Sequence, residues 1–216
     1  MYNSGNLLDV RDIWQAAIEA GDLPESLAAA FTFDGKQYGV PQSASYWVMY
    51  YNKQVFADNG LAVPTTWDEM MSHAETLKGA GVIPFYQTVD GRWPTFIWFE
   101  EFLIRQDPQF YVDLCEGRAS YTDPIAVQAL ETWRGMIENE YFTEVDIPMD
   151  ANLAAMFQAG EIAMVPLGTW FQQQFIAAEM VPGEDYDAFF MPNLNPDLAQ
   201  SVAIVEAGSL CIPASP

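Results

Sequence analysis

Residues 34–70 read DGKQYGVPQSASYWVMYYNKQVFADNGLAVPTTWDEM, and their local signals decide the fold. Asp34-Gly35 separates two short alternating runs, and this dipeptide suits a type I′ hairpin turn because both central residues need a positive φ. The apolar run from Tyr46 to Asn52 has no polar alternation, as expected for a strand buried on both faces. Thr66 and Glu69 have the spacing of a capping box, which begins a helix. The stretch therefore predicts a hairpin, a buried strand and a helix in succession.

Apolar residues at regular spacing extend this pattern in both directions. Helices are predicted over residues 7–30, from Thr66 to Gly79 or Gly81, from Asp123-Pro124 onward and over residues 150–159. The inner stripe of the third helix is expected to contain Ala126, Leu130, Trp133, Ile137 and Tyr141. Further strands are predicted over residues 82–86, 162–165, 188–191 and 202–212. Because helices separate the strands, we expect an α/β lobe with helices packed on a mostly parallel sheet.

The charge of the chain limits its partners. Acidic residues number 30 against 8 Lys and Arg, which gives a net charge of −22. Such a surface repels nucleic-acid phosphates and anionic lipid, and it suits a neutral or cationic ligand. A salty habitat and the ordinary acidic drift of a secreted surface both explain the excess. We expect no nucleic-acid partner.

Membrane insertion of this segment is not expected either. No apolar run is long enough to cross a bilayer. The opening residues MYNSGNLLDV lack the basic and apolar regions of an export signal.

Residues suited to catalysis or metal binding are scarce. Cys115 and Cys211 are far apart and have no histidine pair nearby; buried free thiols are expected, with a disulfide as the alternative. The single histidine, His73, falls on the polar side of its helix and is expected to be solvated. Glu100 and Glu101 are adjacent, so on a helix they diverge by about a quarter-turn and cannot flank one glycosidic bond. The sequence therefore predicts no enzyme activity, no metal and no cofactor.

Aromatic residues beside small polar ones mark the ends of predicted strands. Trp93 and Trp170 each follow a strand, at the edge where open α/β sheets bind ligands. A pyranose has an apolar C–H face and a rim of hydroxyls, so a sugar site needs a flat ring for stacking and polar groups for the rim. The tryptophans on helical apolar stripes, Trp14, Trp67 and Trp133, are expected in the core. Trp93 and Trp170 are therefore the candidates for a sugar site.

The quoted stretch resembles bacterial extracellular solute-binding proteins of the maltose-binding type, in which a G-x-x-Y-G-V-P strand precedes Y-N-K, an apolar helix and P-x-T-W-D-E. Residues 157–170, FQAGEIAMVPLGTW, resemble that family's F-x-x-G-x-A-A-M-x-x-x-G-x-W segment. Residues 203–216, AIVEAGSLCIPASP, resemble its return strand, so the resemblance spans nearly the whole chain. It implies an α/β periplasmic-binding-protein-like (type II) two-lobed fold, here mostly the second lobe with a remnant of the first.

The same resemblance implies which residues contact a ligand. Trp170, in the G-x-W segment, matches the stacking aromatic of the family. Ser45 falls in the first hinge crossing, where the family often places a polar contact, and Gln42 and Tyr46 lie beside it.

Further contacts are implied in two other segments. Trp93 and Asp90 fall in the loop after the second strand of the closing lobe. Glu206 and Gly208 fall on the return strand.

Lobe boundaries and partners also follow from the resemblance. Residues 1–43 are expected to be a remnant of lobe one and the first hinge approach, residues 44–205 lobe two, and residues 206–216 the return hinge strand towards lobe one. Family members are much longer, so the chain is expected to be a fragment. The complete protein is expected to be a periplasmic or extracellular monomer, with a lipid anchor in a preceding segment as one option. Its expected partners are a sugar and the permease subunits of an ABC transporter.

Two other functions stay open at this point. The same fold could bind a polyamine or another cationic small solute, which the net charge of −22 favours. A carbohydrate-active enzyme that uses the aromatic residues as subsites is the alternative from another class.

Overall fold

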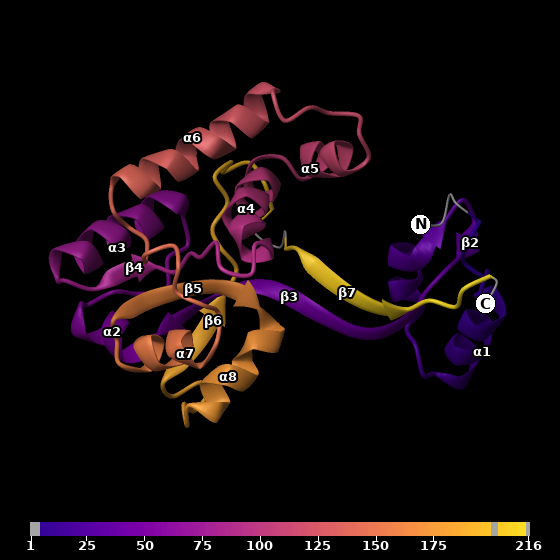
Figure 1. Ribbon diagram of the computed structural model, residues 1–216, viewed down its shortest axis with the longest axis horizontal. Coiled ribbons are helices and arrows are strands. Elements are labelled where there is room, and N and C mark those ends of the chain that lie inside the picture. Colours follow the sequence, from indigo (N-terminus) through magenta and orange to yellow (C-terminus); the bar gives the residue numbers. More distant parts are fainter. Residues whose placement is uncertain (1–4, 200–202, 215–216) are drawn as a thin grey trace. The chain divides into compact units, whose positions relative to one another are not determined.

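A computed structural model describes residues 5–199 and 203–214, and the chain divides into two compact units (Figure 1). The smaller unit comprises Met1–Ser45 and Val205–Pro216, and the larger comprises Tyr46–Ile204. Strand β3 (Val40–Asn52) begins in the smaller unit and ends in the larger. The boundaries expected from the sequence fall close to these positions, whereas the assignment of the units to lobes stays a prediction.

The smaller unit is built around a hairpin and a short helix. Its elements are α1 (Arg11–Ala20), the 3₁₀ helix η2 (Glu25–Phe31), β1 (Thr32–Phe33), β2 (Lys36–Gln37), the start of β3, and β7 (Val205–Leu210), which pairs with β3. Asp34 and Gly35 have φ of 51° and 71°, which confirms the predicted hairpin turn. A small core contains Val10, Trp14 and Phe31.

The single helix predicted over residues 7–30 is wrong. Helix α1 ends at Ala20 because Gly21 adopts the left-handed conformation, with φ 79°, and donates its N–H to carbonyls of the last turn. The chain then enters η2 after a break. Trp14 is the buried residue of α1, while the apolar Ile13 is exposed. Periodicity alone missed the break, because apolar residues continue on both sides of Gly21.

The larger unit contains a mixed sheet in the order β4-β5-β3-β6. Its strands besides β3 are β4 (Ile83–Phe85), β5 (Ile162–Gly168) and β6 (Tyr186–Phe189). Its helices are α2 (Lys53–Asp58), α3 (Trp67–Gly79), η3 (Trp93–Phe96), α4 (Ile97–Gln106), α5 (Pro108–Cys115), α6 (Pro124–Glu138), α7 (Ala151–Gln158), η4 (Thr169–Phe171) and α8 (Gln172–Ala177).

The expected mostly parallel sheet requires a correction. Strands β4 and β5 are parallel, as helical crossover connections demand. Strand β3 lies between β5 and β6 and is antiparallel to both. Strands β4, β5 and β6 therefore share a direction, and β3, which arrives from the smaller unit, runs against them, although helices α2 and α3 connect it to β4. Of the strand predicted over residues 202–212, residue 202 lies outside the described residues, and β7 covers Val205–Leu210.

Helices cover both faces of this sheet, with α3, α4 and α6 on one side and α7 and α8 on the other (Figure 1). Two core clusters result. Met49 of β3 packs into the cluster with Met70 and Phe102. Its neighbour Tyr50 packs into the other, with Phe157 and Phe175. Successive residues of β3 thus serve opposite faces, as the pleat of a buried strand requires.

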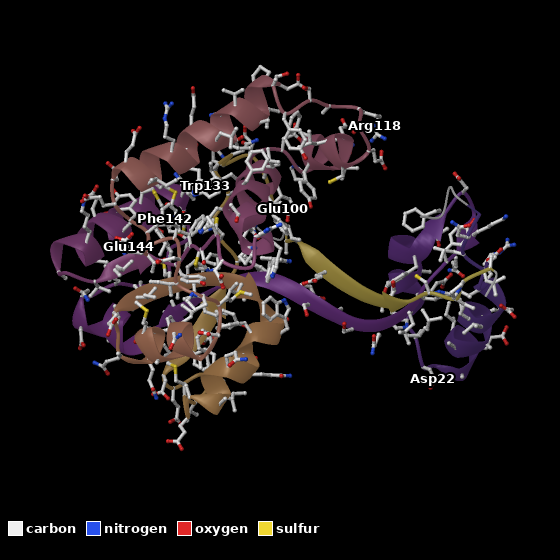
Figure 2. The ribbon with its side chains drawn as sticks, in the orientation of Figure 1. Asp22, Glu100, Arg118, Trp133, Phe142 and Glu144 are labelled. Atoms are coloured by element: carbon white, nitrogen blue, oxygen red, sulfur yellow. The ribbon has the colours of Figure 1, made fainter. Side chains whose placement is uncertain are left out.

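The stripe predicted for α6 is confirmed in part, since Ala126 and Tyr141 are buried in the core and Trp133 packs against it. Leu130 and Ile137 are 45% and 47% exposed, so their assignment to the core is wrong. The buried residues on α6 are Ala126, Ala129 and Met136. Trp133 lies on the same side and packs against the core beneath the helix (Figure 2). The buried face of α6 thus joins the same core cluster as Trp98 and Phe102 of α4.

Three polar residues also differ from expectation. Cys115 and Cys211 are free, but both are exposed rather than buried, since Cys115 ends α5 and Cys211 follows β7. His73 is half-buried rather than solvated, because its ring contacts Phe56 and its Nε2 lies 2.9 Å from the Ala62 carbonyl oxygen.

The predicted capping box at the start of α3 is confirmed. Thr66 Oγ1 accepts the Glu69 N–H at 3.2 Å, and the Glu69 carboxylate accepts the N–H groups of Thr65 and Thr66. Hydrogen bonds from Thr65 hold the pKa of Glu69 below its usual value.

Replacing the cap should measurably destabilise the larger unit. We expect Thr66→Ala to lower the free energy of unfolding by about 1 kcal/mol, because an orphan N–H loses its acceptor. Thr76→Ala, in the same helix, is the matched control: its exposed hydroxyl bonds only the Ser72 carbonyl, so this change should be neutral or stabilising. Urea unfolding measures both. Equal losses in the two variants would contradict the role of the cap.

Candidate ligand-binding site

The structure brings together the two tryptophans that the sequence singled out. The ring centroids of Trp93 and Trp170 are 5.8 Å apart with an interplanar angle of 57°. Phe96 lies 6.1 Å from Trp93, and Trp47 lies 6.2 Å from Trp93 on an edge-to-face contact. These separations are in the range of direct aromatic contact. We call Trp47, Trp93, Phe96 and Trp170 the aromatic cluster.

Strand pairing places Trp170 in this cluster. Trp47 of β3 pairs with Gly168 of β5, and the chain turns into η4 directly after Gly168. The Tyr46 N–H donates to Thr169 Oγ1 at 3.2 Å, which fixes the start of that turn. The Tyr50 hydroxyl donates to the Gly168 carbonyl oxygen at 3.5 Å, and burial raises the pKa of Tyr50, so the donor keeps its proton.

An unusual turn places Trp93. Arg92 has φ 67° and ψ −51°, and the Trp93 N–H donates to the Gly91 carbonyl oxygen at 2.9 Å. This is a γ-turn with positive φ, a conformation that is rare and strained for a residue with a Cβ. The turn directs the chain into η3, which contains both Trp93 and Phe96.

The cluster has one buried and several accessible members. Trp47 is buried at 6% exposure, whereas Trp93 and Phe96 are 38% and 40% exposed. Trp170 is half-buried, and Tyr46, next to Trp47, is exposed. The buried ring of Trp47 contacts Trp93, and Trp93 in turn contacts Phe96 and Trp170, so the accessible rings are held by packing. Large apolar side chains kept at a surface in this way commonly serve a binding site.

This geometry selects how a ligand can bind. Trp93 and Trp170 already touch each other, so no ring fits between their planes. Both side chains stay partly accessible, and we call the accessible parts of these two touching side chains the Trp93–Trp170 wall. Thr169 and the exposed Asp90 lie in the adjoining turns and offer a hydroxyl and a carboxylate. A ligand with a flat apolar face and a polar edge matches this combination.

The remaining predicted site residues lie in the smaller unit. Gln42 is exposed and Ser45 half-buried on β3, and Glu206 is exposed on β7. A Cβ added to Gly208 would lie 2.5 Å from Ser43 Oγ, so close strand contact already explains the glycine there. The structure thus joins Trp93, Trp170 and Tyr46 in one unit, and ligand contact by any predicted site residue stays a prediction.

Sequence reasoning missed Phe96 and Arg92. Asp90-Gly91 is a turn dipeptide, so a sharp turn before Trp93 could have been inferred. The γ-turn at Arg92 and the side on which Phe96 lies depend on tertiary packing and left no local signal.

Other site types are not supported by the described part of the chain. Over residues 5–199 and 203–214, no group of His, Cys, Asp or Glu is arranged to hold a metal ion. Within the same ranges, no helix is long and apolar enough to span a bilayer.

Comparisons with known proteins agree on one family. The sequence model of the family described as bacterial extracellular solute-binding protein matches residues 2–215. An uncharacterised ABC transporter extracellular-binding protein of Pyrococcus horikoshii is 28% identical over 193 residues, which are 88% of this chain and 43% of that protein. A probable sugar-binding periplasmic protein of Brucella suis is 27% identical over 192 residues, which cover 84% of this chain and 43% of that protein.

The fold is also found among solved structures. A chitin oligosaccharide binding protein superposes with a TM-score of 0.82 at 23% identity, over 99% of this chain and 54% of that chain. This likeness shows the α/β fold of a type II periplasmic binding protein. The chain spans about half the length of the relatives that it matches.

The γ-turn before Trp93 can be tested without a ligand. Arg92→Gly and Arg92→Ala both remove the charge, and they differ only in the Cβ that makes positive φ costly. We expect the glycine variant to be more stable than the alanine variant by about 1 kcal/mol in urea unfolding. An alanine variant as stable as the glycine variant would contradict the strained turn.

Proposed function

Because the chain belongs to the bacterial extracellular solute-binding proteins, we propose that the protein binds a mono- or oligosaccharide outside the cytoplasm and delivers it to an ABC importer. One observation carries the proposal: Trp93 and Trp170 touch each other and remain accessible beside polar groups. The similarity to a probable sugar-binding periplasmic protein of Brucella suis and to a chitin oligosaccharide binding protein supports the same ligand class. The permease subunits of the importer are the proposed protein partners.

Stacking and hydrogen bonding provide the binding free energy in this proposal. The C–H face of the sugar leaves water when it covers the indole of Trp170, which is favourable in proportion to the apolar area buried. The hydroxyl rim keeps its hydrogen bonds through groups such as Thr169 and Asp90. Neither interaction changes a covalent bond, so the protein returns its cargo unchanged.

Catalysis of sugar hydrolysis is disfavoured by the state of the adjacent carboxylates. Glu101 is buried and forms an ion pair with Arg105 at 2.9 Å. Glu100 accepts a hydrogen bond from the Tyr111 hydroxyl at 3.3 Å, and burial raises its pKa. Each carboxylate is engaged by its own partner, so the two do not act on one glycosidic bond.

A cationic solute is the second candidate, and the net charge of −22 favours it. A buried ammonium group needs converging carboxylates. At the aromatic cluster the adjoining loop contributes Asp90, and a single exposed carboxylate is a weak partner for a polyamine. A neutral saccharide therefore fits the cluster better.

A thermal-shift screen of the full-length protein tests the ligand class. Mono-, di- and oligosaccharides are compared with spermidine, and a specific ligand at about 100 times its dissociation constant should add roughly 2.7 kcal/mol of stability. Stabilisation by a saccharide supports the proposal. Stabilisation by spermidine alone would contradict the proposal and indicate a cationic ligand. Turnover of an oligosaccharide would contradict it and indicate an enzyme.

The best saccharide from that screen then tests the site. We expect Trp170→Ala to weaken its binding about 30- to 1000-fold in calorimetry, because truncating a buried aromatic anchor costs roughly 2–4 kcal/mol. Trp67→Ala is the control: Trp67 is also half-buried, but it packs on Phe102 outside the aromatic cluster. Unchanged affinity in Trp170→Ala would remove this residue from the site.

A further inference from the structure

Gly168 stands at the end of β5 without a backbone reason to be glycine. Its φ of −67° and ψ of 153° are extended values that every residue type adopts. The residue is buried and pairs with Trp47 in a regular ladder register. The absence of a side chain at this position must therefore have another cause.

The indole of Trp170 occupies the space that a side chain would need. A Cβ added to Gly168 would lie 2.2 Å from Nε1, 2.6 Å from Cδ1 and 3.0 Å from Cε2 of Trp170. Carbon atoms in contact normally stay about 3.5–4.0 Å apart, so an added methyl group and this ring position exclude each other. These ring atoms are the nearest neighbours of the added Cβ, which makes the conflict specific to Trp170.

Two further neighbours contact the ring, which is otherwise partly accessible. Phe171, which is buried, meets Trp170 edge to face at 5.9 Å. Trp93 touches it at 5.8 Å. Gly168 closes the third side, against the edge of the indole that contains Nε1. A ring displaced by a methyl group must therefore move into one of these neighbours or out into solvent.

We propose that Gly168 is a positioning residue for ligand binding: its missing side chain lets the Trp170 indole pack against the end of β5, in the orientation that makes a common wall with Trp93. The proposal rests on the proposed function, since it concerns the same aromatic cluster. Gly168 itself need not touch the ligand. Its effect on affinity passes through Trp170.

A double-mutant cycle in the full-length protein tests this coupling, with the saccharide found by the thermal-shift screen as the probe. Gly168→Ala should weaken binding about 10- to 100-fold, because the stacking ring is displaced. Trp170→Ala measures how much saccharide affinity is lost when the indole ring is absent. In the double variant, the added methyl group should cost no further affinity, since the ring with which it would collide is gone.

Gly135→Ala is the matched control. Gly135 lies in α6 of the same unit, and an added Cβ there would meet nothing within 4 Å. This variant should bind the saccharide like the unchanged protein. It should also be slightly more stable, because alanine favours a helix interior over glycine.

Each other outcome overturns the proposal in a recognisable way. Wild-type affinity in Gly168→Ala, with a loss in Trp170→Ala, removes Gly168 and leaves the proposed function standing. Wild-type affinity in both single variants removes the aromatic site altogether. An equal loss from Gly168→Ala with and without Trp170 means that the methyl group acts through the fold.

The proposal can still be tested if Gly168→Ala does not fold. Should Gly168→Ala fail to fold, the double variant must fold, because it lacks the ring that causes the collision. A double variant that also fails to fold would show that the methyl group meets something other than Trp170, which contradicts the proposal.

Discussion

The pairing of β3 with β5, in which Trp47 lies opposite Gly168, is the contact on which the candidate site depends. It sets a buried tryptophan beside the point where β5 ends, and the chain leaves that point toward Trp170. A shift of one residue in this register would turn every side chain of β3 to the opposite face of the sheet. Met49 and Tyr50 enter opposite core clusters, so such a shift would disrupt both, and the register is strongly fixed.

Local sequence signals predicted the elements that depend on few residues. The turn at Asp34-Gly35 and the capping box at Thr66 are each decided by neighbours in the chain, and both are confirmed. The helix predicted over residues 7–30 failed because apolar periodicity was followed through Gly21 and Pro24, and Gly21 ends the helix in a left-handed turn. In the stripe of α6, Leu130 and Ile137 were placed wrongly because the limits of the buried face depend on what the helix packs against, which local periodicity does not encode.

The site shows the same division. Trp93 and Trp170 were identified from the sequence because each follows a predicted strand, and the structure places their rings in contact. Two structural features that position these tryptophans could not be predicted from local sequence. The γ-turn at Arg92 is a strained conformation that only the surrounding fold maintains, and the need for glycine at position 168 arises from a side chain in the following turn. Strain and close packing at one surface are typical of sites that require fixed geometry.

The central claim is that the Trp93–Trp170 wall receives the apolar face of a saccharide. Saturation-transfer NMR measures this most directly, because saturation of the protein protons reaches most strongly the ligand protons that lie closest to the protein, and the Trp170→Ala variant shows which of these contacts the indole makes. For a saccharide bound by the full-length protein, we predict strong transfer to the C–H protons of one sugar face and weak transfer to the opposite face, and a loss of this pattern in Trp170→Ala. Uniform transfer over the bound sugar, or a selective pattern that survives the loss of Trp170, would contradict the account.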